Sequence, residues 1–161
     1  MAFKIVTANV NTNAAELCRS VSIYAYYTDR KGDSKLYSSY LLAIKNVSFS
    51  AGGRQIIDNI GPTETKLLGT SLGVGEANNT NENLYYSNPT DNVYTYNFCQ
   101  DPQDDSYYSG GISFSALSSQ HWKVDVVARK NLDITVVIKL NSYQVVAVSS
   151  NDGRMTTGLS V

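Results

Sequence analysis

The stretch that decides the fold runs from residue 121 to residue 129 and reads His-Trp-Lys-Val-Asp-Val-Val-Ala-Arg. Side chains on a β-strand point alternately to the two faces of a sheet. One face of this stretch would receive the apolar side chains Trp122, Val124, Val126 and Ala128. The opposite face would receive the polar side chains His121, Lys123, Asp125 and Arg129. The pattern predicts a half-buried strand with Trp122 facing inward.

Two more runs follow this stretch, from Asp133 to Leu140 and from Tyr143 to Val148, and only Asn141-Ser142 separates them. The first run alternates apolar and polar residues over most of its length, and a gap of two residues suits a tight hairpin. We therefore predict a three-strand antiparallel meander from residue 121 to residue 148. Its outer face would suit contact with a neighbouring molecule and would carry Lys123, Asp125, Val127, Thr135, Val137 and Lys139.

Similar short runs recur along the rest of the chain, at residues 3–10, 21–27, 36–44, 47–50, 55–60, 64–68, 91–99 and 112–117. Asn13 followed by Glu16 has the form of a helix-capping pair, which predicts at most one short helix near residues 13–19. Roughly 8–10 short strands separated by turn signals indicate an all-β fold. We predict one antiparallel, jelly-roll-like β-sandwich domain over residues 1–161.

Two long irregular segments interrupt the strands, a Gly- and Asn-rich loop at 69–90 and an acidic, Tyr-bearing loop at 100–111. Loops of this length are uncommon in compact domains, and many of them bind partners. Exposed tyrosines give stiff contact area with a polar tip, which suits protein interfaces and stacking on sugar rings. The candidate interface or ligand contacts are therefore Tyr85, Tyr86, Asp101, Asp104, Asp105, Tyr107 and Tyr108.

The remaining strand tyrosines have a simpler interpretation. Tyrosine is favoured in ordinary β-sheets. We expect Tyr24, Tyr26, Tyr94 and Tyr96 to pack or to form ladders across strands.

Composition excludes several classes of protein. Lys and Arg total 13 against 14 acidic residues, so a nucleic-acid-binding role, which needs a basic face, is not expected. The net charge of -1 leaves little repulsion between copies and favours self-association. No run of 18 apolar residues could span a membrane. Met1 leads straight into strand alternation without the apolar core of a secretory signal, which predicts cytoplasmic synthesis.

Catalytic and metal-binding groups are sparse. His121 is the only histidine, and no Gly-x-Ser-x-Gly motif supplies a nucleophile, so we expect no enzyme activity and no cofactor. Cys18 and Cys99 are expected to be buried thiols rather than a disulfide. Asp101, Asp104 and Asp105 could offer oxygen ligands to calcium, but their spacing matches no EF-hand loop and a solvated turn is the simpler interpretation.

These observations lead to two functional hypotheses. The first is a non-enzymatic structural protein that self-assembles or docks into a larger particle, such as a virion or phage shell accessory or a cytoplasmic inclusion. The alternative is a lectin-like carbohydrate-binding module that uses the Tyr, Asp and Asn residues of the loops. Because a sandwich fold hosts many functions, the step from fold to function is an analogy.

Overall fold

The computed structural model describes residues 3–30, 41–61, 93–100, 108–129, 132–143, 146–148 and 155–157. Within these residues the regular structure is almost entirely β-strand, with 3-10 turns at Thr28–Arg30 (η1) and Phe114–Ala116 (η3). The strands are β1 (Phe3–Thr12), β2 (Leu17–Tyr27), β3 (Ile44–Ala51), β4 (Arg54–Ile60), β5 (Val93–Asn97), β6 (Ile112–Ser113), β7 (Gln120–Arg129), β8 (Ile134–Ser142), β9 (Val146–Val148) and β10 (Met155–Thr157).

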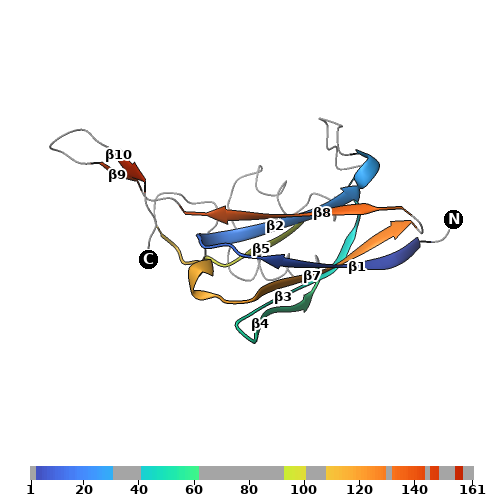
Figure 1. Ribbon diagram of the computed structural model, residues 1–161, viewed down its shortest axis with the longest axis horizontal. Helices are drawn as coiled ribbons and strands as arrows, with labels where there is room; N and C mark the ends of the chain where they lie inside the picture. Colours follow the sequence, from blue (N-terminus) through green and yellow to red (C-terminus); the bar gives the residue numbers. More distant parts are fainter. Residues whose placement is uncertain are drawn as a thin grey trace, which may run out of the picture.

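Most of these strands form two antiparallel sheets that lie over one another as layers (Figure 1). The first sheet has the order β1-β7-β3-β4. In the second, β2 is central, with β8 along one edge and β5 and β6 along the other. The chain changes sheet between β1 and β2, between β2 and β3, between β4 and β5, between β6 and β7, and between β7 and β8. This confirms the predicted jelly-roll-like sandwich.

A third, two-stranded sheet consists of β9 and β10, whose register pairs Met155 with Val148 and Thr157 with Val146. It follows β8 in the chain and stands away from the two main layers (Figure 1). An isolated two-stranded ribbon is only marginally stable in water. We infer that this ribbon adds little to the stability of the sandwich.

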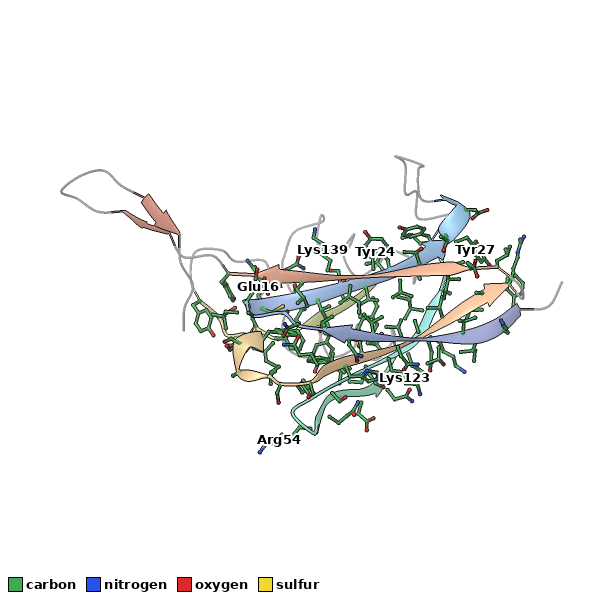
Figure 2. All side chains as sticks on the ribbon, viewed as in Figure 1. Glu16, Tyr24, Tyr27, Arg54, Lys123 and Lys139 are labelled. Carbon is green, nitrogen blue, oxygen red and sulfur yellow. The ribbon has the colours of Figure 1, made fainter. Side chains whose placement is uncertain are left out.

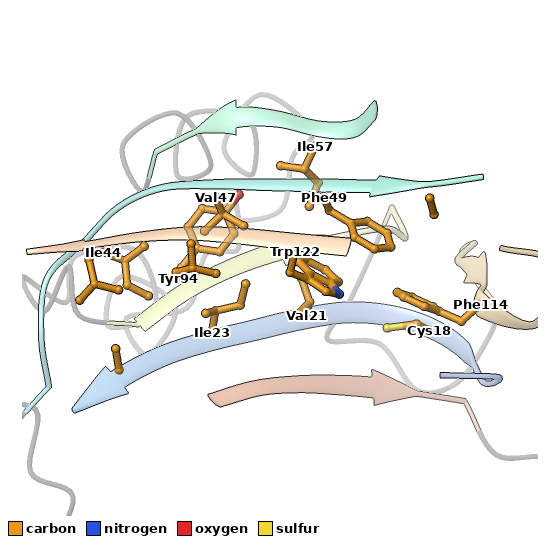
Figure 3. Close-up of a cluster of buried hydrophobic side chains, with 14 residues drawn as sticks. Cys18, Val21, Ile23, Ile44, Val47, Phe49, Ile57, Tyr94, Phe114 and Trp122 are labelled. Atoms are coloured by element: carbon orange, nitrogen blue, oxygen red, sulfur yellow. The ribbon is translucent and has the colours of Figure 1, made fainter. Parts of the chain in front are cut away.

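The core lies between the two main sheets and is built around Trp122 (Figure 3). The Trp122 ring stacks on Phe49, with ring centres 3.9 Å apart, and Phe49 in turn stacks on Phe114 at 5.5 Å. The inward residues of β7, namely Trp122, Val124, Val126 and Ala128, are fully buried, as their alternation predicts. From the opposite sheet, Val21, Ile23 and Tyr94 close the core and are also fully buried.

The predicted meander is wrong. The neighbours of β7 are β1 and β3, so both of its edges are occupied, and β8 pairs with β2 in the other sheet. The predicted hairpin residues Asn141 and Ser142 belong to the end of β8. Thr135, Val137 and Lys139 therefore lie on a different outer face from Lys123, Asp125 and Val127.

No helix forms near residues 13–19, where at most one short helix was predicted, because tertiary partners take the backbone groups of this segment. The Gln120 side chain accepts a hydrogen bond from the Ala14 N–H (3.0 Å) and donates one to the Ala14 carbonyl (2.8 Å). The Glu16 carbonyl accepts from Phe114, and residue 17 already begins β2. A capping pair alone does not form a helix when these longer-range bonds are available.

Two local features shape strand β3. Its register against β7 shifts between Ile44 and Asn46. The turn at Ala51-Gly52-Gly53 links β3 to β4, and Gly52 and Gly53 have φ of 56° and 76°, where glycine is favoured.

Candidate interaction surfaces

Of the seven predicted contact residues, the structure describes Tyr108. Tyr85 and Tyr86 lie in the loop at 69–90, which is outside the described residues. Asp101, Asp104, Asp105 and Tyr107 are likewise outside them, so the calcium and sugar-contact predictions for these residues stay predictions. The flanks of the acidic loop are described, at Gln100 and from Tyr108 to Gly111.

Tyr108 is 60% exposed and lies in a small aromatic cluster at the end of the sandwich. Its ring centre is 5.1 Å from that of Tyr143, at an angle of 60°. The guanidinium carbon of Arg19 lies 5.3 Å from the centre of the Tyr143 ring, within the range of a cation–π contact. Burial raises the pKa of the Tyr143 phenol, and the neighbouring Ser109 and Arg19 side chains oppose this rise. The cluster therefore presents one open ring, that of Tyr108, on a packed base.

The acidic loop is fixed at its base against β2. The Gln100 N–H donates to the Ser109 carbonyl at 3.1 Å, which closes the loop. Gly111 lies so close to β2 that a Cβ atom there would be 2.8 Å from the Cys18 carbonyl oxygen. Gly110 has a φ of 115°, a conformation that other residues rarely adopt. The loop therefore leaves the sandwich beside the Tyr108 cluster.

The two cysteines are free and buried, as predicted. The Cys18 thiol donates to the carbonyl oxygens of Ser20 (3.0 Å) and Asn141 (3.4 Å), which lie on β2 and β8. Burial raises the pKa of this thiol to about 11, so it is protonated at neutral pH. Cys18 therefore packs as an uncharged core residue and is not an activated nucleophile.

The outer face of the second sheet carries an aromatic and aliphatic row. The register places Val137 of β8 and Val93 of β5 on either side of Tyr24. The rings of Tyr24 and Tyr26 stack with their centres 6.5 Å apart, so these two tyrosines pack against each other along β2 rather than across strands. Figure 2 shows Tyr24 and Lys139 on this outer side, and Lys123 and Arg54 on the side of the other sheet.

The outer face of the first sheet is divided into a polar and an apolar part. At the polar end, His121 Nδ1 lies 2.8 Å from Asn11 Oδ1, and the Thr7 hydroxyl donates to Asp125 at 2.7 Å. At the apolar end, Phe3 and Ile5 are 63% and 50% exposed, and the register places Val127 beside Ile5. We call Phe3, Ile5 and Val127 the apolar patch.

Strand β1 is an edge strand of the first sheet. All ten of its residues pair with β7 in one continuous register without a bulge, and the strand contains no proline. Among the described strands, none pairs with its other edge. Natural proteins usually protect such an edge with bulges, prolines, charges or short length. Here one charged residue, Lys4, is present, and the edge is long and regular.

Of the apolar patch, Val127 lies on the predicted contact face, whereas Phe3 and Ile5 were not among the predicted contacts, although the sequence contained a signal for them. The residues of β1 that face the core are Val6, Ala8 and Val10. Phe3 and Ile5 instead share a face with the polar residues of the same strand, Thr7, Asn9 and Asn11. Apolar side chains on a strand's polar face indicate either a contact surface or chance exposure, and the alternation alone could not separate them.

The described residues do not assemble a recognisable catalytic or metal site. In that part of the chain, no three His, Cys, Asp or Glu side chains gather where they could hold a metal ion. His121 lies at the polar end of the first sheet, where its hydrogen bond is to an amide side chain. No helix in the described part is long and apolar enough to cross a membrane.

Comparison with known proteins finds a likeness in fold to a solved structure. No family model matches the sequence, and neither does any curated protein. Among solved structures, the chain is similar to one in "PBCV-1 virus capsid, quasi-atomic model", with a TM-score of 0.62 and 9% sequence identity. The match covers 99% of this chain and 50% of that chain, so the chain spans about half the length of that capsid chain. At this identity the likeness shows the fold alone.

Proposed function

We propose that this chain is a non-enzymatic structural protein that assembles, with copies of itself or with other proteins, into a larger particle such as a virus shell. The observation that carries the proposal is the likeness of almost the whole chain to half of a virus capsid chain. On this proposal the protein is found in a particle, or in a cytoplasmic inclusion of assembled copies. Its role is mechanical, and it needs no cofactor.

The surface of the described residues supports an assembling protein. Exposed apolar side chains occur on both outer faces, at Phe3 and Ile5 on one sheet and at Val93 on the other. The net charge of -1 opposes close packing of copies only weakly. Exposed apolar residues that gather beside a regular sheet edge are typical of surfaces that meet other proteins.

The proposal is tested by the size of the purified protein over a range of concentrations. Light scattering coupled to size exclusion should show species larger than one chain, and electron microscopy should show ordered particles or lattices under crowding salts. A mass of one chain at every concentration, together with an absence of particles by microscopy, would rule the proposal out.

A second candidate, binding of a glycan, is favoured by one observation. The Tyr108 ring is 60% exposed beside Tyr143, at the base of a loop that contains three aspartates. An open ring on a fixed base suits stacking against a sugar. A glycan array, probed with and without calcium, tests this. Binding that is lost in Tyr108→Ala but kept in Tyr24→Ala would support the second candidate, and an array without hits would eliminate it.

A further inference from the structure

The outer edge of β1 combines the two features that strand addition from another molecule requires. Its backbone is regular over ten residues, and within the described strands no neighbour occupies that edge. The apolar patch lies directly beside it, at Phe3, Ile5 and Val127. An unpaired edge offers backbone N–H and C=O groups to an incoming strand, and adjacent apolar side chains add affinity and fix the register.

We propose that β1 pairs antiparallel with β1 of a second copy, about a twofold axis that passes through Ile5. In this register Ile5 faces its own copy, and Phe3 faces Thr7 of the partner. A twofold contact uses the same surface on both molecules, so one patch is sufficient to make it. The two four-stranded sheets would then form one continuous sheet across the dimer.

In this register, the rows of side chains that run across the strands of the extended sheet are complementary in polarity and charge. Because β1 pairs Ile5 with Val127, the central row would contain two Ile5 and two Val127 side chains. Because β1 also pairs Phe3 with Arg129 and Thr7 with Asp125, each row beside it would have Arg129 of one copy at one end and Asp125 of the other copy at the opposite end. The apolar row is thus central and the charges are balanced.

A register centred on Thr7 would join more residues but would be less complementary. It would place Ile5 opposite Asn9 and Phe3 opposite Asn11. Both apolar side chains would then face amides, and the Asp125 carboxylates of the two copies would share a row. Like charges and mismatched cross-strand pairs are unfavourable. The geometry therefore favours Ile5 as the centre.

This contact specifies the first step of the self-assembly proposed above, and it rests on that proposal. A five-residue pairing between edges is a small interface, so we expect a dimer that depends on concentration. Such a weak contact suits a subunit that is soluble when dilute and assembles when many copies gather.

Disulfide trapping tests the register directly. Residues opposite one another on antiparallel strands have Cα atoms about 4.5–5.5 Å apart, which lies within the roughly 4.4–6.8 Å that a disulfide spans. Under mild oxidation, Ile5→Cys should convert most of the chain to a linked dimer, while the native Cys18 and Cys99 stay buried. Thr7→Cys is the matched control, because the two Thr7 positions would be offset by about 14 Å along the strands and should not link.

Sedimentation analysis of variants that associate without a disulfide gives an independent measurement of the dimer. Ile5→Lys should abolish the dimer, whereas Asn9→Lys, on the same face of the same strand, should leave the dimer constant within about twofold. Trapping of Thr7→Cys in preference to Ile5→Cys would overturn the register. Equal dimerisation of Ile5→Lys and the native chain would overturn the contact.

The same experiments separate this inference from the proposed function. If the native chain forms particles that Ile5→Lys still forms with equal efficiency, the β1 contact is wrong and the structural role stands. If the Ile5→Cys variant forms no linked dimer and the native chain forms no larger species, both proposals fail.

Discussion

Strands β1 and β7 lie side by side in one sheet and have equal length, yet they differ in the pairing of their edges and in the exposure of their apolar side chains. β7 is paired on both edges, and its inward side chains are fully buried around Trp122. β1 is paired with β7 on one edge and exposes Phe3 and Ile5. The comparison separates two uses of apolar residues, since the inward residues of β7 hold the fold, whereas Phe3 and Ile5 of β1 are exposed and available to another molecule.

The largest effect should come from truncating the centre of β7. Trp122→Ala removes the ring that stacks on Phe49 and leaves a large cavity. Comparable substitutions lower the free energy of unfolding by about 3–5 kcal/mol. Urea unfolding followed by circular dichroism should show this, with Lys123→Ala, one residue along on the exposed face, as the control. A loss below about 1 kcal/mol would contradict the central position of Trp122.

The next effect concerns Cys18 and alkaline pH. The folded pKa of about 11 lies above the ordinary value of 9.0, so the unfolded thiol loses its proton first. The free energy of unfolding should therefore fall as pH rises from about 9 to about 11, by up to about 3 kcal/mol from this group.

The variant Cys18→Ala isolates the contribution of the thiol from those of other groups that titrate at alkaline pH. Its stability should fall less steeply than that of the native chain between pH 9 and pH 11. Parallel pH profiles for the two proteins would show that the pKa of Cys18 is not raised.

A smaller effect is expected at Gln120, the buried first residue of β7. Its side chain bonds both backbone groups of Ala14 and donates to the carbonyls of Phe114 and Leu117. Gln120→Ala leaves these groups without that partner, which should lower the free energy of unfolding by about 1–3 kcal/mol. The exposed Gln100→Ala serves as the control in the same denaturation experiment. Equal stabilities of the two variants would exclude this role.

The smallest effect on folding should come from the apolar patch of β1. Because Ile5 is half exposed, Ile5→Lys should change the free energy of unfolding by about 0.5 kcal/mol or less. Thermal unfolding of dilute protein measures this. A loss comparable with that of Trp122→Ala would mean that Ile5 belongs to the fold, and the contrast between the two strands would disappear.

The sequence predicted the sandwich and the buried face of β7 because alternation over nine residues depends on local geometry alone. It could not predict that β8 joins the other sheet, because strand pairing depends on which edges are already occupied. The capping pattern at Asn13 and Glu16 does not form a helix, because the distant Gln120 side chain binds the backbone N–H and carbonyl of Ala14. No local pattern marks Gln120 as a buried hydrogen-bonding residue.

The candidate site was predicted only in part. Tyrosine content drew attention to the loops, and Tyr108 is indeed exposed. Phe3 and Ile5 of the apolar patch were not predicted as contacts, because they resemble ordinary strand residues until the inward face of β1 is known. Exposure of a strand residue depends on the sheet that covers it, which is a property of the whole fold.

The most direct test of the account is hydrogen exchange measured at several protein concentrations. Amides of β7 are bonded within the fold and should exchange slowly at every concentration. Amides on the outer edge of β1, within residues 3–8, should exchange quickly in dilute protein and slowly at concentrations where light scattering detects association. Association without any slowing in β1 would contradict the account, because the contact between copies would then lie elsewhere.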